Sequence, residues 1–150
     1  MICDRSLTSN IDRHRISSKR LQKGLQGNIG LEMFVEQSKY RLPTVVAVKI
    51  PHGIDDKQFA KYLMERFVLS PQPLQSTSGL AALTFFSIRF RHSLEISTGM
   101  GATTGQIFRI GLMNENAAQR NVDFILRAFY DALQTMIPNY VVPTANTYFY

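Results

Sequence analysis

The last third of the chain contains the feature that most constrains the fold, a long amphipathic segment. Its apolar side chains recur every three or four residues, at Val122, Ile125, Leu126, Phe129, Leu133 and Met136. This spacing places them on one face of an α-helix, which has to pack against a core. Asn116 followed by Gln119 has the pattern of a capping box and predicts the start of this helix. Pro138 predicts its end, because proline does not fit a helix interior.

The remaining chain alternates between helix and strand patterns. A helix with a narrow apolar stripe is predicted over residues 11–29, with Gly30 as its stop. A second helix is predicted from Asp55, capped through Gln58, and its core face carries Phe59, Tyr62, Leu63 and Phe67. Short strands are predicted at 31–35, 44–50, 94–97 and 106–113, with 44–50 as a central strand. This order predicts an α+β domain whose helices cover one side of a small sheet.

Composition excludes several classes of protein. The 150 residues suffice for one domain, and no apolar run reaches the roughly 20 residues of a membrane-spanning helix. No secretory signal is recognisable at the N-terminus. Cys3 is the only cysteine, which excludes an internal disulfide and a cysteine-rich zinc site. The three histidines are scattered, so no metal site is predicted.

The positive charge is concentrated at the N-terminus. Residues 1–24 hold six basic residues against two acidic ones, a net +4 within the total of +6. A nucleic-acid arm, an organelle-targeting helix and the solvated face of a helix are all compatible with this charge. The solvated face is favoured, because no aromatic residues are interleaved for base stacking. We therefore expect neither nucleic-acid binding nor membrane insertion.

Residues 99–111 form the segment with the most chemical information. Gly99, Gly101 and Gly105 allow a sharp bend and close approach of a ligand, and backbone N–H groups there are able to cradle phosphate. However, no Gly-Lys-Ser/Thr follows, so a P-loop is excluded. The glycine spacing also misses the dinucleotide-binding pattern by one residue, and a strand follows in place of a helix. Nucleotide binding is therefore not expected.

Arg109 is the candidate binding residue of this segment. It lies between Phe108 and Ile110 in a predicted strand, where alternation places its side chain on the opposite face from both. A guanidinium there can bind a carboxylate through its planar fork. A structural ion pair or simple solvent exposure are the alternatives. From the alternation alone these alternatives are favoured, because most arginines are exposed.

Several motifs together resemble one enzyme family. They are Arg41–Val45, Tyr62–Phe67, Leu94–Ile96, the glycine-rich turn 99–105, Arg109–Leu112 and Asn121–Asp123. In this order they resemble the C-terminal small domain of class V, fold type I aminotransferases, most of all the alanine–glyoxylate (serine–pyruvate) aminotransferases. The likeness covers roughly residues 12–133, apart from 68–93. We accordingly expect a divergent tail at 1–11, the small domain at 12–136 and a divergent tail at 137–150.

The resemblance implies a function and a site. It gives Arg109 the role of binding the α-carboxylate of the substrate, an amino acid such as alanine or serine or a 2-oxo acid such as glyoxylate or pyruvate. It implies pyridoxal phosphate as cofactor, a homodimer, and a peroxisomal, mitochondrial or cytosolic location. The terminal residues 148–150 are not a Ser-Lys-Leu type of peroxisomal signal. The alternative function is a non-catalytic module that binds small carboxylates or a protein.

The resemblance also implies what the chain lacks. In the family the Schiff-base lysine lies in a large domain that precedes the matching segment, so no catalytic or cofactor-binding residue is predicted here and the isolated chain is expected to be inactive. Lys23, after Gln22, is superficially similar to the family's lysine motif but lies on the basic helix face. Residues 68–93 interrupt the family pattern. We interpret them as an insertion or, preferably, as translated non-coding sequence, which transcript sequencing would decide.

Overall fold

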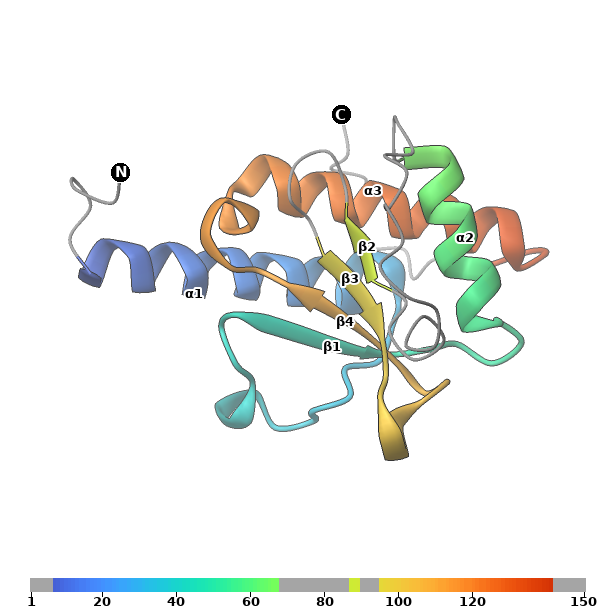
Figure 1. Ribbon diagram of the computed structural model, residues 1–150, viewed down its shortest axis with the longest axis horizontal. Coiled ribbons are helices and arrows are strands. Elements are labelled where there is room, and N and C mark those ends of the chain that lie inside the picture. Colours follow the sequence, from blue (N-terminus) through green and yellow to red (C-terminus); the bar gives the residue numbers. More distant parts are fainter. Residues whose placement is uncertain (1–6, 68–86, 90–94, 142–150) are drawn as a thin grey trace, which may run out of the picture.

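A computed structural model describes residues 7–67, 87–89 and 95–141 (Figure 1). Its helices are α1 (Leu7–Lys23), α2 (Asp56–Phe67) and α3 (Gln119–Met136). Its strands are β1 (Val45–Lys49), β2 (Ser87–Arg89), β3 (Glu95–Thr98) and β4 (Ile107–Gly111). Short helical turns occupy Gly24–Ile29, Ser38–Tyr40, Gly101–Thr103 and Asn114–Ala117. No helix of the described residues is long and apolar enough to cross a membrane.

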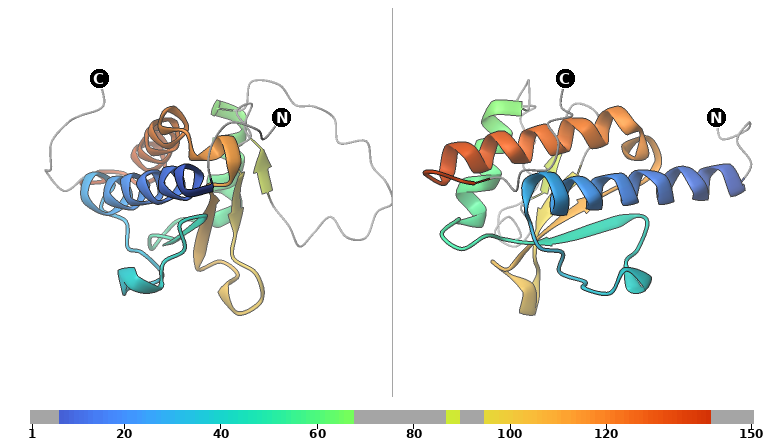
Figure 2. Two further views of the ribbon diagram at one scale, coloured as in Figure 1. Left: turned by 90° about the vertical axis from the view of Figure 1, so that its left-hand side faces the viewer. Right: turned by 180° about the vertical axis from the view of Figure 1, so that it is seen from behind.

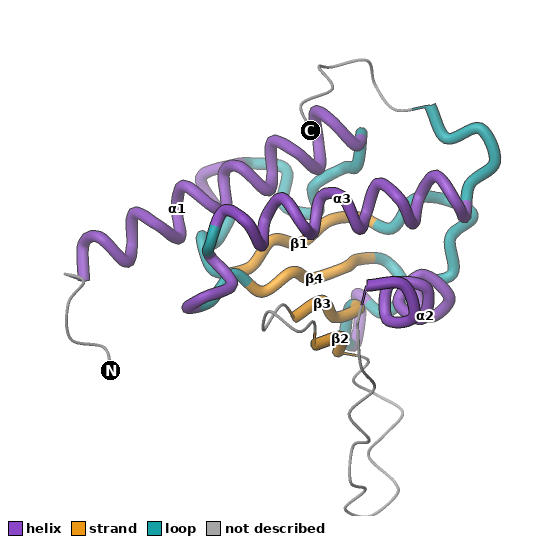
Figure 3. Tube along the Cα trace, turned by 90° about the horizontal axis from the view of Figure 1, so that it is seen from above, coloured by secondary structure: helices purple, strands orange, loops and turns teal. Residues whose placement is uncertain are grey.

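The four strands form one antiparallel sheet in the order β1-β4-β3-β2. Helices α1 and α3 lie side by side over one face of this sheet, and α2 packs against α3 towards its C-terminal end (Figures 2 and 3). The predicted α+β architecture, with helices on one side of a small sheet, is confirmed.

The first helix is longer than predicted, and its hydrogen-bonding pattern changes from α to π at Gly24. It starts at Leu7, and from Gly24 to Ile29 the chain continues as a π-helix that ends at Gly30 in the left-handed conformation. Gly24 packs closely against α3, because a Cβ there would lie 2.5 Å from a methyl group of Leu126. One turn earlier, on the same face of α1, Arg20 forms an ion pair of 2.8 Å with Asp123 of α3. Part of the predicted basic face therefore binds α3.

Three local predictions were wrong. Of the strand predicted at 31–35, only Met33 forms a bridge, opposite Val48. Residues 44–50 were predicted as a central strand, but β1 is the outermost strand of the sheet order and this bridge covers its free edge. The capping role of Asn116 is not observed, because Asn116 belongs to a 3-10 turn and α3 begins after Ala118. The amide oxygen of Asn116 is buried with no hydrogen-bond partner among the described residues.

The atypical segment 68–93 lies mostly outside the described residues, which exclude 68–86 and 90–94. Within it, Ser87–Arg89 forms β2 and pairs with β3, Ile88 opposite Ile96. The sequence did not predict this strand. Whether the segment is an insertion or translated non-coding sequence stays a prediction, as do the proposed tail boundaries.

The core lies between the sheet and the helices and is centred on three aromatic rings. Phe108 of β4 stacks on Phe59 of α2 at 4.7 Å between ring centroids, and both rings contact Phe129 of α3. All three side chains are at most 1% exposed. The predicted core faces of α2 and α3 are thus confirmed, as is the Asp55 cap, whose carboxylate accepts a hydrogen bond from the Gln58 N–H at 2.8 Å.

Tyr140 links the chain after α3 to the end of the first helical segment by a hydrogen bond. Its hydroxyl donates to the carbonyl oxygen of Ile29 at 2.7 Å, at the end of the π-helix. Burial raises the pKa of the Tyr140 hydroxyl above its ordinary value. The segment after α3 therefore contributes a partly buried hydrogen bond that joins two distant parts of the sequence.

Removing the aromatic ring at the centre of the core should destabilise the domain strongly. We expect Phe129→Ala to lower the free energy of unfolding by about 3–5 kcal/mol, because it leaves a cavity between Phe59 and Phe108. Tyr130→Ala, at a neighbouring position that is 40% exposed, should cost much less. Urea unfolding measures both variants, and equal losses would contradict the assigned core.

The Tyr140 contact predicts a specific dependence of stability on pH. Because the folded state holds the pKa of Tyr140 above its unfolded value of about 10, this contribution is complete below pH ~10 and declines as the pH rises through the folded pKa. Tyr140→Phe should cost about 1 kcal/mol at neutral pH through the lost hydrogen bond. It should also reduce the loss of stability between neutral and alkaline pH. An unchanged alkaline slope in this variant would contradict the assignment.

Candidate carboxylate-binding site

The alternation of β4 separates Arg109 from the core. Phe108 and Ile110 are 1% and 0% exposed and belong to the core, whereas Arg109 is partly exposed on the other face of the sheet. Ile107 shares the face of Arg109 and is buried outside the main core cluster. The predicted orientation of Arg109 is therefore confirmed, and the helices lie on the opposite side of the sheet (Figure 3).

Small residues flank Arg109 on both sides. Ala47 of β1 and Ser97 of β3 are its partners in the strand register. Side chains at directly paired positions lie on the same face of a sheet, so neither neighbour is large enough to cover the guanidinium. The register neighbours of Arg109 on both adjacent strands are therefore small.

The guanidinium of Arg109 is oriented by one backbone contact. Its Nε donates to the carbonyl oxygen of Thr98 at 3.3 Å. No carboxylate of the described residues forms an ion pair with it. A structural ion pair, one alternative for this residue, is thus not found in the described part of the chain. The two terminal nitrogens are the groups that a ligand carboxylate would bind, side by side.

The glycine-rich turn after β3 is closed by its own hydrogen bonds. The N–H groups of Thr103, Thr104 and Gln106 donate to carbonyl oxygens within the turn at 3.1–3.2 Å. At Gly99 a Cβ would lie 1.8 Å from the carbonyl oxygen of Thr103. The close approach that this glycine permits is therefore between two parts of the backbone. These three N–H groups are therefore not free to bind a phosphate.

Arg41 has a structural role that the sequence did not reveal. Its Nε and Nη2 donate to the carbonyl oxygens of Val35 and Glu36 at 2.7 and 2.8 Å. Its Nη1 donates to the side-chain oxygens of Gln22 and Gln26 in the first helical segment, at 3.1 and 3.3 Å. Sequence analysis used Arg41 only as part of a family motif. The long-range contacts that define its role are not visible in local patterns.

The described residues do not fit pyridoxal phosphate. A lysine that forms a Schiff base needs burial or a cationic neighbour to lower its pKa, and Lys23 and four of the other lysines are exposed. The sixth, Lys49, is partly exposed, and its hydrogen bond to Glu32 at 3.0 Å raises its pKa. No group of three potential metal ligands occurs among the described residues either.

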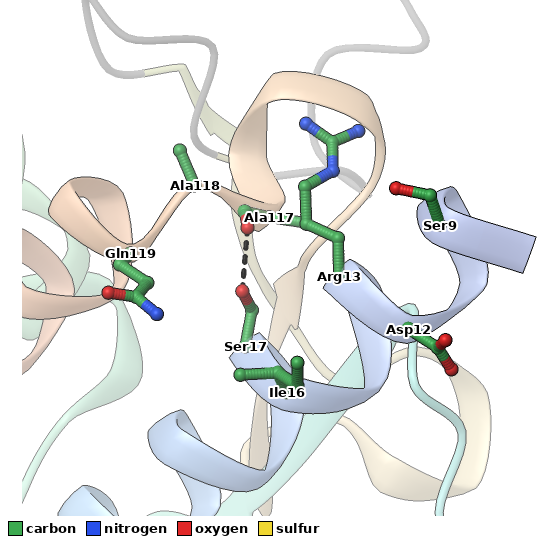
Figure 4. Close-up of a pocket in the computed structure, with 8 residues that line it drawn as sticks. All are labelled: Ser9, Asp12, Arg13, Ile16, Ser17, Ala117, Ala118 and Gln119. Atoms are coloured by element: carbon green, nitrogen blue, oxygen red, sulfur yellow. Dashed lines mark hydrogen bonds between the residues drawn. The ribbon is translucent and has the colours of Figure 1, made fainter. Parts of the chain in front are cut away.

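A separate hollow of about 500 Å³ lies on the helical side, between the first half of α1 and the turn before α3 (Figure 4). Its floor includes the hydroxyl of Ser17, which is buried and donates to the carbonyl oxygen of Ala117 at 2.6 Å. Asp12 and Arg13 also line it, and Arg109 is not among its lining residues. This hollow is therefore distinct from the Arg109 face.

Solved structures with the same fold are aminotransferases. The chain superimposes on the ureidoglycine–glyoxylate aminotransferase of Bacillus subtilis with a TM-score of 0.68 at 24% identity, which shows the shared fold. It matches the alanine–glyoxylate aminotransferase of Nostoc sp. with a TM-score of 0.66 at 28% identity, over 89% of this chain and 28% of that one. The fold is therefore that of a portion of a class V aminotransferase, as the motifs indicated.

Sequence comparison identifies the relatives more closely. The chain is 38% identical over 133 residues to the alanine–glyoxylate aminotransferase of Drosophila melanogaster and 33% identical over 134 residues to that of Callithrix jacchus. These matches cover 89% of the chain but only 27% and 26% of the two relatives, so the chain spans about a quarter of their length. No protein-family model matches. The expected resemblance to one portion of the alanine–glyoxylate aminotransferases is confirmed.

The turn beside Arg109 should be intolerant of any side chain at Gly99. We expect Gly99→Ala to destabilise the domain by about 2–3 kcal/mol, because the new Cβ collides with the Thr103 backbone. Gly27→Ala is the matched control, since a Cβ at Gly27 has nothing within 4 Å. That variant should be neutral or slightly stabilising, because alanine favours helix over glycine. Urea unfolding distinguishes them, and a neutral Gly99→Ala would refute the closed turn.

Proposed function

We propose that this chain binds the α-carboxylate of a small amino acid or 2-oxo acid through Arg109, as the substrate-binding part of a pyridoxal-phosphate-dependent aminotransferase. The expected reaction transfers the amino group of alanine or serine to glyoxylate or pyruvate. The observation that carries this proposal is the guanidinium of Arg109 on the face of the sheet opposite the described helices, with small register neighbours and no carboxylate partner among the described residues. The relatives named alanine–glyoxylate aminotransferases support the reaction class.

The chemistry of Arg109 suits this role. A guanidinium presents parallel N–H donors that match the two oxygens of a carboxylate, and such charge-assisted bonds fix the orientation of the ligand as well as its position. Holding the carboxylate determines where the Cα of the substrate lies relative to other reacting groups, which is an orientation effect on rate. Arg109 is thus proposed as a binding and orienting residue.

The cofactor has to be held elsewhere in the assembly. When bound, pyridoxal phosphate supplies the electron sink for transamination, but no described residue of this chain fits its Schiff base. We propose that the cofactor-binding groups belong to a large domain such as the family has, and that the active unit is a homodimer. The 150 residues alone are accordingly proposed to be catalytically inactive. A peroxisomal, mitochondrial or cytosolic location stays a prediction.

Carboxylate binding by the 150-residue chain tests this proposal. We expect glyoxylate and pyruvate to bind with weak, millimolar affinity in an NMR titration, and Arg109→Gln to weaken binding by about 10–100-fold through the loss of charge-assisted hydrogen bonds. Arg109→Lys should recover part of the affinity, since lysine keeps the positive charge but lacks the two parallel N–H donors of the guanidinium. Arg127→Gln, an exposed arginine on α3, is the matched control and should change nothing.

Two results would contradict the proposal, and a third would favour its alternative. Binding that survives Arg109→Gln unchanged would exclude Arg109 as the carboxylate-binding residue. A stoichiometric aldimine between pyridoxal phosphate and the chain, seen by absorbance and lost in Lys23→Ala, would show that the chain holds its own cofactor. Carboxylate binding through Arg109 in any larger assembly that never shows transamination would favour the alternative, a non-catalytic binding module.

A further inference from the structure

The hydrogen-bond pattern between β3 and β4 determines the direction in which the Thr98 carbonyl group points. The Gly99 N–H donates to the carbonyl oxygen of Ile107 at 2.9 Å, which makes these two residues a hydrogen-bonded pair of the antiparallel ladder. Such pairs recur at every second residue, so Ser97 and Arg109 form the next one. Thr98 lies between Ser97 and Gly99, and its N–H and carbonyl groups therefore point away from β4.

The side chain of Arg109 reaches across β3 to this carbonyl group. Its Nε donates to the Thr98 oxygen at 3.3 Å, and that oxygen points away from the strand on which Arg109 lies. The side chain has to pass over β3 in order to make this contact. The guanidinium consequently lies on the β3 side of β4, away from β1, which is the neighbour of β4 on the other side (Figure 3).

The positions beside this path carry small residues. Ser97 is the register partner of Arg109, and paired side chains lie about 4.5–5.5 Å apart on the same face of a sheet. Gly99 occupies the next position of that face. A Cβ at Gly99 would lie 1.8 Å from the carbonyl oxygen of Thr103, so the turn already fills the space on that side. The path of Arg109 therefore runs between the Ser97 side chain and the turn.

The size of residue 97 thus decides whether the guanidinium is able to take this position. Serine carries only a hydroxyl group beyond its Cβ, whereas leucine carries a branched chain. Beside a leucine, Arg109 has no way to move towards Gly99, because the Thr103 backbone lies there. A large side chain at position 97 would therefore displace the guanidinium from the Thr98 carbonyl oxygen.

We propose that Ser97 is the positioning residue of Arg109: its small side chain admits the guanidinium over β3, so that the ligand carboxylate is bound on the β3 side of β4. This inference rests on the proposed carboxylate binding by Arg109. It adds to that site the side of the strand on which the ligand is held and the residue that permits this. The role of Ser97 is one of size, so its hydroxyl is not required. Ala47, the other register partner of Arg109, has no such role.

Leucine substitutions at the two register partners of Arg109 test this asymmetry. We expect Ser97→Leu to weaken pyruvate binding by the 150-residue chain by about tenfold or more in an NMR titration, the range for losing charge-assisted hydrogen bonds. Ala47→Leu is the matched control at a partly exposed position on the other side of β4, and it should weaken binding much less. Ser97→Ala should retain the affinity, because alanine is no larger than serine. Urea unfolding shows whether each variant is folded.

The direction of the Arg109 side chain is also measurable without any substitution. In the ¹³C- and ¹⁵N-labelled wild type, nuclear Overhauser effects should connect the Nε proton of Arg109 with the β protons of Ser97 and not with the methyl group of Ala47. In Ser97→Leu the same Nε proton should exchange faster with solvent, since its bond to the Thr98 carbonyl oxygen is lost. If Ser97→Leu does not fold, the Overhauser effects of the wild type decide.

The outcomes separate the positioning role from the carboxylate site. Retained binding in Ser97→Leu, equal losses in Ser97→Leu and Ala47→Leu, or Overhauser effects to Ala47 alone would overturn the role of Ser97, while a loss of binding in Arg109→Gln would leave the carboxylate site standing. A loss of binding in Ser97→Ala would make the hydroxyl a ligand and overturn the argument from size. Absence of pyruvate binding in the wild type, or binding independent of Arg109, would overturn both.

Discussion

The alternation of side chains in β4 is the constraint on which the rest of the structure depends. Phe108 and Ile110 must face the helices, because Phe108 completes the aromatic contact with Phe59 and Phe129. A shift of β4 by one residue would exchange the two faces and bury the guanidinium of Arg109 in this apolar core. Burying an unpaired charge costs far more than a domain of this size can tolerate. The core thus dictates that Arg109 points away from the helices.

The neighbouring strands determine the surroundings of the Arg109 side chain. Ala47 and Ser97 are the small register neighbours of Arg109, and the Thr98 carbonyl oxygen orients its Nε. On the far side of Ala47, the Phe34 N–H donates to the Ala47 carbonyl oxygen, and Arg41 holds the carbonyl oxygens of Val35 and Glu36 directly after it. Arg41 also binds Gln22 and Gln26, so it ties the first helical segment to the chain that covers the free edge of β1.

Local patterns predicted those parts of the structure that depend on local physics. The apolar stripe of α3, the core face of α2 with its Asp55 cap, and the orientation of Arg109 all follow from the periodicity of helices and strands and are observed. Where the structure differs from the predicted elements, long-range contacts are the cause. The predicted strand at 31–35 is reduced to one bridge because Arg41 bends the chain after Phe34, and the Asn116 pattern lies in a separate turn before α3. No local pattern in the sequence indicated that Ala47 pairs with Arg109.

The most direct test of the account is to observe the guanidinium of Arg109 while a 2-oxo acid binds. In a titration of the ¹⁵N-labelled chain with pyruvate, the side-chain resonances of Arg109 should shift with saturation, together with the amides of Ala47 and Ser97. The amides of Phe129 and its neighbours in α3 should remain unchanged, since α3 lies on the opposite face of the sheet. Pyruvate-dependent shifts confined to the helical side, or none at Arg109 at saturating pyruvate, would contradict the central claim that this face of the sheet binds carboxylates.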